Sequence, residues 1–181
     1  YLRNVVGDFN GDGMSDMAGL IADAADDWRV CFSNGNTFNS CVVWRGTHFM
    51  PYVVADFDGN GTSDMAHHSG DTVTQNWRVC YFSGSGSNCG TMATGYQNWT
   101  DKTKGGDLNG DGRSDFFDHK GGGIWRVCLS IGLAFSCGDW PALAASSANT
   151  TAGDFNGDGL TDIAAYTGSG TNWHVCLSTG A

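Results

Sequence analysis

The stretch GDFNGDGMSD, at residues 7–16, holds three aspartates, one asparagine and three glycines in ten residues. Near-copies follow as ADFDGNGTSD at 55–64, GDLNGDGRSD at 106–115 and GDFNGDGLTD at 153–162. The first aspartates of the four copies are separated by 48, 51 and 47 residues. Self-similarity at a fixed period of this length is typical of repeat architectures, in which each unit is one supersecondary structure.

A second motif keeps the same period. WRVC occurs at 28, 77 and 125, and WHVC occurs at 173. Short runs rich in Val, Trp, Phe and Cys are separated by Asn, Gly, Ser and Asp, which is typical of strands joined by turns, and no segment has a convincing helical period. Four short strands in such a unit match the size of a propeller blade. We therefore expect an all-β fold, a β-propeller-like array of four roughly 48-residue, four-stranded blades.

The array is expected to be one repeat domain over residues 1–181, with units at approximately 1–48, 49–99, 100–146 and 147–181. A β-solenoid, whose coils usually need fewer residues, and a linear string of small β units are the alternatives.

The charge of the chain is concentrated in the repeated loops. The formal net charge is −10, the chain has no glutamate, and 12 of its 19 aspartates lie in the four loops. The nine Lys and Arg residues are scattered and form no basic stripe, so nucleic acid is not an expected partner. No apolar run approaches the roughly 18 residues of a membrane helix, so no membrane span is expected.

Counted from its first aspartate, each acidic loop places polar side chains at positions 1, 3, 5 and 9 and offers a backbone carbonyl at position 7. Glycines at positions 4 and 6 permit a curl that brings these oxygens together. Oxygen ligands without His or Cys select Ca²⁺ or Mg²⁺ over zinc, and a flexible cage of protein oxygens suits Ca²⁺ better because Mg²⁺ keeps more of its water. An EF-hand is excluded, because the Glu that it needs at position 12 is replaced by Gly19, His67, Asp118 and Ala165.

The loops therefore predict about four Ca²⁺ sites. The predicted ligands, with position 7 contributing its carbonyl, are Asp8, Asn10, Asp12, Met14 and Asp16; Asp56, Asp58, Asn60, Thr62 and Asp64; Asp107, Asn109, Asp111, Arg113 and Asp115; and Asp154, Asn156, Asp158, Leu160 and Asp162. Asp-Gly and Asn-Gly pairs are also good turn formers, so one such loop alone could be only a turn. Four loops with three carboxylates each would repel strongly when empty, which favours cation sites.

The loop pattern D-x-[ND]-G-[DN]-G-x-[ST]-D, on a β unit of about 50 residues, resembles the FG-GAP or VCBS repeats of integrin-α propellers and of many secreted bacterial and fungal proteins. The resemblance covers all four units, although the FG and GAP signatures are not visible and paired cysteines are not general to the family. It implies a β-propeller with Ca²⁺ in the loops that join the first two strands of each blade. It also implies a role in adhesion, in sugar binding as a lectin, or as an accessory module of a secreted enzyme.

Six of the seven cysteines fall into repeated pairs. The segments between paired cysteines have hairpin-turn chemistry, so each pair is expected to form a disulfide across a two-strand hairpin. The pairs are Cys31 with Cys41, Cys80 with Cys89, and Cys128 with Cys137. Buried free thiols are the alternative, and the absence of C-x₂-C excludes the usual zinc and redox motifs. Disulfides together with calcium predict a secreted, extracellular or cell-surface protein.

The fourth unit stops at LSTGA after WHVC, so it lacks the closing strand and the cysteine that would pair with Cys176. Residues 1–7, YLRNVVG, match the lead-in runs PYVVA and NTTAG that precede loops two and four, contain no cysteine and do not supply that strand. We expect the last blade to be incomplete, with an edge that invites another strand. The array is hypothesised to continue in a longer chain or in a further copy of itself docked end to end, as a ring or an open filament.

The tryptophans and histidines bear on function. Trp28, Trp77, Trp125 and Trp173 recur in register and are expected in the core between blades. The remaining tryptophans follow the repeat less closely and are the candidates for a ligand-facing surface: Trp44, Trp99 and Trp140. His67 and His68 are the concentrated candidates for catalysis, but the other units carry unlike residues there, and the chain has no phosphate loop, catalytic triad signature or cofactor motif.

We therefore expect no catalytic residues and a non-catalytic, calcium-stabilised extracellular module for recognition or adhesion, with a carbohydrate or protein ligand. A structural building block of an extracellular filament and an accessory module of a larger secreted enzyme are the alternatives. Filaments would distinguish the structural role, and a glycan-array screen the lectin role.

Overall fold

The computed structural model describes residues 4–21, 27–44, 53–68, 76–83, 86–92, 103–121, 123–141, 150–166 and 173–180. Within these ranges all regular secondary structure is β-strand, which confirms the all-β prediction. Blade 1 contains β1 (Asn4–Gly7), β2 (Asp16–Leu20), β3 (Trp28–Ser33) and β4 (Phe38–Trp44). Blade 2 contains β5 (Val53–Ala55), β6 (Asp64–His68), β7 (Trp77–Phe82) and β8 (Ser87–Met92). Blade 3 contains β9 (Lys104–Gly106), β10 (Asp115–Gly121), β11 (Ile124–Ser130) and β12 (Phe135–Pro141). Blade 4 contains β13 (Thr150–Gly153), β14 (Asp162–Tyr166) and β15 (Trp173–Cys176).

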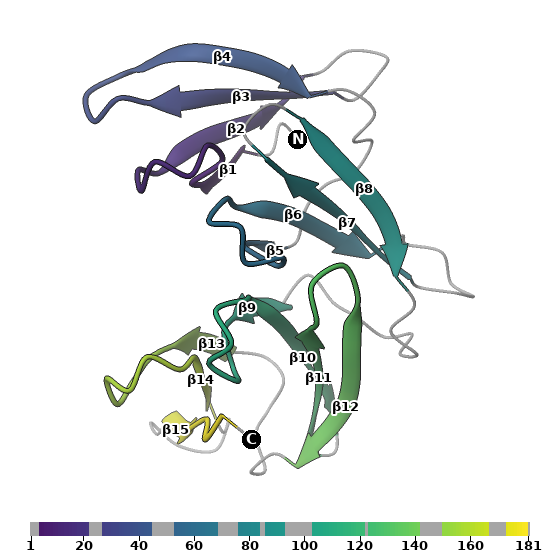
Figure 1. Cartoon of the computed structure of the whole chain (residues 1–181). Helices are drawn as coiled ribbons and strands as arrows, with labels where there is room; N and C mark the ends of the chain where they lie inside the picture. Colours follow the sequence, from purple (N-terminus) through teal and green to yellow (C-terminus); the bar gives the residue numbers. More distant parts are fainter. Residues whose placement is uncertain are drawn as a thin grey trace.

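Each blade is an antiparallel meander in which neighbouring strands in the sequence are neighbours in the sheet. The fourth sheet has three strands within the described residues, as the sequence predicts. The sheets are arranged around a common axis in the manner of a β-propeller, and they follow one another along an arc with blades 1 and 4 at its ends (Figure 1). The first strands of consecutive blades contact one another, β1 with β5, β5 with β9 and β9 with β13. This arrangement rules out the β-solenoid and the linear string.

Strand sequence and blade position together decide which side chains are buried. In β3 of blade 1, Trp28 and Val30 are buried and Arg29 between them is exposed, as expected for a strand with one covered face. In β7 of blade 2, Val79 and Cys80 point to opposite faces and both are buried. Blade 2 has a neighbour on each side, so both of its faces pack.

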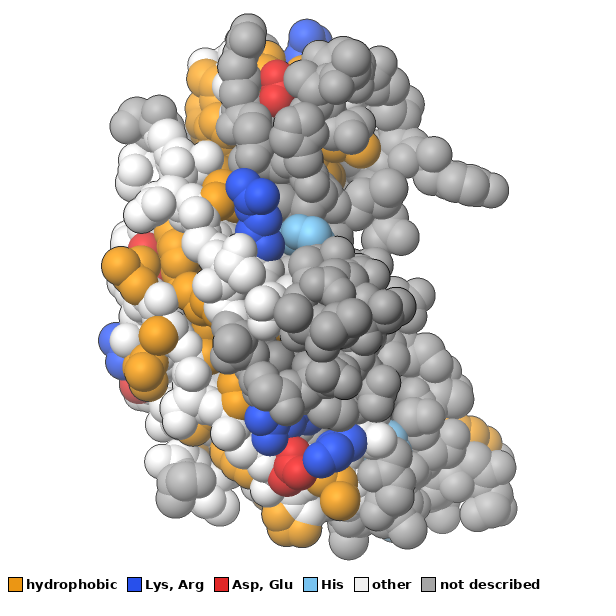
Figure 2. Space-filling model, turned by 90° about the vertical axis from the view of Figure 1, so that its right-hand side faces the viewer, with side chains coloured by type: hydrophobic (Ala, Val, Ile, Leu, Met, Phe, Trp, Pro, Cys, Tyr) orange, Lys and Arg blue, Asp and Glu red, His pale blue; other side chains and the backbone are white. Residues whose placement is uncertain are grey.

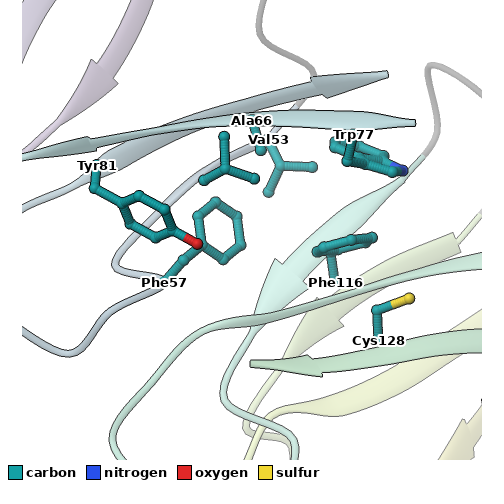
Figure 3. Close-up of a cluster of buried hydrophobic side chains, with 8 residues drawn as sticks. Val53, Phe57, Ala66, Trp77, Tyr81, Phe116 and Cys128 are labelled. Carbon is teal, nitrogen blue, oxygen red and sulfur yellow. The ribbon is translucent and has the colours of Figure 1, made fainter. Parts of the chain in front are cut away.

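A separate hydrophobic cluster fills the space between each pair of consecutive blades. Between blades 2 and 3, the rings of Trp77 and Phe116 lie 4.5 Å apart, and Phe57 meets Phe116 edge to face at 6.2 Å. Figure 3 shows Phe57, Trp77 and Tyr81 of blade 2 on one side of this cluster and Phe116 and Cys128 of blade 3 on the other. The stability of the array therefore rests on contacts between blades, as in other repeat proteins.

The three predicted disulfides are confirmed. They join Cys31 to Cys41, Cys80 to Cys89, and Cys128 to Cys137. Each closes the hairpin between the third and fourth strands of its blade, where the two cysteines are directly paired in the antiparallel register. Cys176 is half-buried on β15 and forms no disulfide within the described residues.

The expectation for the repeated tryptophans holds in three blades and is wrong in the fourth. Trp28, Trp77 and Trp125 are buried between blades. Trp173 is half-exposed, because the face of blade 4 on which it lies is not covered by another blade in the described structure. Its environment follows from its place in the array and not from its own strand sequence.

The outer surface agrees with the scattered charge of the sequence. Figure 2 shows that the Lys and Arg side chains of the described part of this face lie in small separate groups and form no continuous stripe. In blade 3, Asp139 forms a cross-strand cluster in which it accepts from Lys120 at 2.7 Å and from Arg126 at 3.0 Å. No helix in the described ranges could cross a membrane.

Candidate functional site: the acidic loops and the hollow between blades 2 and 3

The four acidic loops connect the first and second strands of their blades, and in Figure 1 all four lie on the left-hand side of the molecule. Their shape depends on two glycines each. Gly11 and Gly13 of loop 1 have φ of 76° and 82°, and the corresponding glycines of the other loops are also left-handed. Because residues with a Cβ rarely adopt this conformation, the curl predicted from positions 4 and 6 depends on glycine.

The aspartate at position 1 organises the loop backbone. In loop 1, Oδ1 of Asp8 accepts hydrogen bonds from the N–H groups of Gly11 (2.7 Å) and Asp12 (3.2 Å), and Oδ2 accepts one from Gly13 (2.7 Å). Oδ1 of Asn10 accepts from the same Asp12 N–H at 3.0 Å. The side-chain oxygens of positions 1 and 3 therefore turn toward one point inside the loop, and loops 3 and 4 repeat this pattern.

The aspartate at position 9 is buried and ties the loop to the third strand. Oδ2 of Asp16 accepts from the N–H of Phe9 at 2.9 Å, and Oδ1 accepts from the N–H of Ser33 at 2.7 Å. The same pair of bonds recurs in each blade, made by Asp64, Asp115 and Asp162. These carboxylates hold the loop in place and lie beside the other acidic groups of their loops.

Loop 2 shows how closely the carboxylates come together. Asp56, Asp58 and Asp64 each have an oxygen within 4.8 Å of the others. Burial is the main reason that the pKa of Asp64 is raised to about 8. The backbone N–H groups of Phe82 and Phe57 act to lower this pKa, and the negative charges of Asp58 and Asp56 act to raise it. Burial also raises the pKa of Asp58, with Asp56 adding to the effect. Three carboxylates crowded in this way repel one another, and a hard divalent cation is the kind of group that they could hold.

Position 7 packs against the preceding blade. A Cβ added to Gly11 would lie 3.3 Å from Cγ2 of Thr62, and one added to Gly110 would lie 2.8 Å from Cδ2 of Leu160. The position-7 side chain thus covers the position-4 glycine of the preceding loop. Successive loops are also joined by the backbone, because the N–H of Ser63 donates to the carbonyl of Asp8 at 2.5 Å, and the same bond recurs in the next two pairs.

A hollow of about 320 Å³ opens beside loop 2, at the junction of blades 2 and 3. Its lining includes Asp58 and Asn60 from the loop, residues of the β7–β8 hairpin, and Leu133 from the β11–β12 hairpin. The Tyr81 hydroxyl donates to the carbonyl of Gly132 at 3.3 Å and so links the two hairpins. Burial raises the pKa of Tyr81, so this hydroxyl stays protonated. The hollow offers carboxylate, amide and hydroxyl groups beside an exposed aliphatic side chain.

Neither Trp44 nor Trp140, two of the predicted ligand-facing tryptophans, lines this hollow. Trp44 is 5% exposed and stacks on Phe82 with ring centroids 3.8 Å apart, so its assignment to a ligand surface is wrong. Trp44 pairs with Trp28 across the β3–β4 hairpin, and this register places it in the core. Trp140 is half-buried against the third cluster, and Trp99 lies outside the described residues.

The sequence reasoning did not identify the side chains of the hollow outside the acidic loop. They lie on or between the third and fourth strands, at positions that differ from blade to blade: Tyr81 on β7, Ser83 after it, Ser87 and Asn88 on β8, and Leu133 between β11 and β12. The sequence held one signal for them, because these positions depart from the repeat that the rest of each unit follows. His67 is half-buried on β6, and the side chain of His68 is not described.

Comparison with known proteins agrees with this architecture. Residues 148–175, which contain the fourth acidic loop, match the FG-GAP repeat family model. No curated protein matches the chain significantly. Among solved structures, an Agrocybe aegerita lectin, described for specific recognition of non-reducing terminal N-acetylglucosamine, has a TM-score of 0.63 and 19% sequence identity. The match covers 97% of this chain and 52% of the lectin chain, so this chain spans about half of the lectin's length.

At that identity the lectin shows the fold alone. Three disulfides together with such a repeat are typical of extracellular proteins. The matched repeat and the four-bladed fold together support an FG-GAP-type propeller family for this chain.

Proposed function

We propose that this chain is a non-catalytic carbohydrate-recognition module of a secreted or cell-surface protein, stabilised by Ca²⁺ in its acidic loops. The observation that carries the proposal is the hollow at the junction of blades 2 and 3. Sugars are held by hydrogen bonds to their hydroxyls and by apolar contact with their C–H faces, and this hollow combines both kinds of group. The likeness of the fold to a lectin supports the same class of ligand.

The residues present fit calcium. Positions 1, 3, 5 and 9 would supply side-chain oxygens and position 7 a carbonyl, and the left-handed glycines already curl the loop around them. When bound, the ion would neutralise carboxylates that the loop's own N–H donors offset only in part. In loop 2 these ligands would be Asp56, Asp58, Asn60 and Asp64, with the carbonyl of Thr62.

The two parts of the proposal share residues. Asp58 and Asn60 belong both to loop 2 and to the wall of the hollow. The amide of Asn60 donates to the carbonyl of Phe82 at 2.8 Å, so the loop also positions the end of β7. Calcium in loop 2 would therefore fix one wall of the sugar site, and chelation is expected to weaken glycan binding.

A glycan array tests the proposal, with glycans ending in N-acetylglucosamine among the first probes. We expect binding in calcium that falls at least tenfold in the Asn88→Ala variant, because Asn88 is an exposed amide at the hollow. Asn39→Ala is the matched control, since Asn39 is an exposed amide on the corresponding hairpin of blade 1. No glycan bound at all, or equal loss in both variants, would refute the assignment of this hollow to sugar binding.

A further inference from the structure

The three blade junctions inside this chain are copies of one interface. We call the side of a blade that contacts the next blade its trailing face, and the side that contacts the preceding blade its leading face. The trailing face carries the position-2 residue of the acidic loop and the Trp and Val of the third strand. In blades 1 to 3 these are Phe9, Trp28 and Val30; Phe57, Trp77 and Val79; and Leu108, Trp125 and Val127. All nine are at most 2% exposed.

The trailing face of blade 4 carries the same kinds of residue, and no blade among the described residues covers it. Phe155 is 49% exposed, Trp173 is 52% exposed and Val175 is 41% exposed. In blades 1 to 3 the three corresponding side chains pack into one cluster. Phe155, Trp173 and Val175 therefore belong to one continuous surface of blade 4. An exposed apolar surface of this composition is typical of an interaction site.

The leading face of blade 1 is the complementary surface. The residue after the position-9 aspartate is buried in the other blades, as Met65, Phe116 and Ile163, whereas Met17 of blade 1 is 37% exposed. Met17 lines an open hollow of about 540 Å³ together with Gly19, Arg29 and Cys31. In blade 3 the equivalent of Met17, Phe116, receives the ring of Trp77 at 4.5 Å.

The polar contacts of the junction are also incomplete at both ends. At each junction the N–H of loop position 8 donates to the carbonyl of position 1 in the preceding loop. The residues that would continue this series are Ser15 of blade 1 as donor and Asp154 of blade 4 as acceptor, and among the described residues neither makes that bond. Gly157, the position-4 glycine of loop 4, has nothing within 4 Å of a built Cβ, whereas its counterparts at Gly11, Gly59 and Gly110 meet the next blade.

We propose that the trailing face of blade 4 docks on the leading face of blade 1 of a second copy of this chain, reproducing the internal blade junction between subunits. The occupant is a second copy because one chain carries both halves of an interface that it already forms three times. Two such contacts related by a two-fold axis close a ring of two copies. The proposal does not rest on sugar binding.

Native mass spectrometry and sedimentation velocity across the micromolar range, in calcium, test the proposal. We expect a species of twice the 19.1 kDa of one chain. Trp173→Asp, on the trailing face, and Met17→Asp, on the leading face, should each give monomers. Both side chains are partly exposed in the single chain, so the fold should survive, and unchanged circular dichroism checks this. Val175→Asp is the second trailing-face variant.

Ile131→Asp is the control, because Ile131 is an apolar residue at a hairpin turn of blade 3, outside both faces, and is exposed like Trp173 and Met17. It should remain a dimer. A mixture of Trp173→Asp and Met17→Asp chains retains one intact contact per pair and should form a one-to-one heterodimer that neither variant forms alone. A monomeric wild-type chain, a dimer that survives both face variants, or a mixture that stays monomeric would overturn the proposal.

Discussion

At the scale of single residues, the position-9 aspartates have the most consequential role in the blade. Asp64 is fully buried, accepts two backbone N–H groups and lies within 4.8 Å of two other carboxylates. An ionised carboxylate in such a place is unfavourable without a cation, although its hydrogen bonds are essential to the loop. We therefore expect this residue to make the stability of the fold depend on pH, and on calcium if loop 2 binds it as proposed.

The metal-free protein is expected to lose stability as the pH rises. Burial raises the pKa of Asp64 to about 8 in the folded protein, from 3.8. The folded state therefore holds its proton more tightly than the unfolded state, and the resulting stabilisation is present at low pH and is lost as the pH rises from about 4 to about 8. Urea unfolding of the decalcified protein at pH 5 and pH 8 measures this difference, which should shrink in Asp64→Asn.

Asp139→Asn is the control for this experiment. Hydrogen bonds from Lys120 and Arg126 hold the pKa of Asp139 below its usual range, so its titration lies below the window of the measurement. A difference between pH 5 and pH 8 that is the same in wild type and Asp64→Asn would contradict the role given to Asp64.

At the scale of the strand and the loop, close packing between blades depends on small residues beside the acidic loops. Gly106 ends β9, and a Cβ there would lie 2.5 Å from Cγ2 of Thr161 in the next blade. Gly7 of β1 is similarly close to Ser63. The chain needs glycine at these two positions because the next loop approaches the backbone directly, and not because of an unusual φ.

Gly106→Ala is therefore expected to destabilise the junction of blades 3 and 4. The new methyl group overlaps the short, branched side chain of Thr161, and overpacking of this kind costs about 1–3 kcal/mol. Gly138→Ala in β12 is the matched control, because a Cβ there meets nothing within 4 Å, and it should change stability by less than about 0.5 kcal/mol. Denaturant unfolding of both variants compares them directly, and equal effects would show that the contact with Thr161 is not limiting.

At the scale of the whole molecule, the acidic loops are coupled from blade to blade. The hydrogen bond from Ser63 to Asp8 and its counterparts link each loop to the next, so the loops form a continuous row on one side of the array. A cation that orders one loop should therefore stabilise its neighbours as well, as expected where nearest-neighbour contacts dominate stability.

Calcium is expected to raise the melting temperature in a concentration-dependent way. An ion that binds only the folded state adds RT ln(1 + [L]/Kd) per site, about 2.7 kcal/mol at a hundredfold excess over Kd. Calorimetry with chelator and then with excess Ca²⁺ measures the shift, and Asp111→Asn in loop 3 should reduce it in part. Identical melting curves with chelator and with calcium would contradict the calcium sites.

The sequence by itself determined the repeat, the strands, the disulfide pairs and the three-stranded last blade. These properties depend on neighbours close in the chain: glycines at loop positions 4 and 6, and cysteines that face each other across one hairpin. Only the tertiary structure decided which side chains a ligand or another subunit can reach. Trp44 and Trp173 are both strand tryptophans, yet Trp44 is buried by Phe82 of the next blade and Trp173 is half-exposed, because burial here depends on whether a neighbouring blade covers that face. The hollow beside loop 2 likewise forms only where the β7–β8 hairpin of blade 2 lies beside the β11–β12 hairpin of blade 3. The sequence pattern of one hairpin does not predict which hairpin will lie next to it.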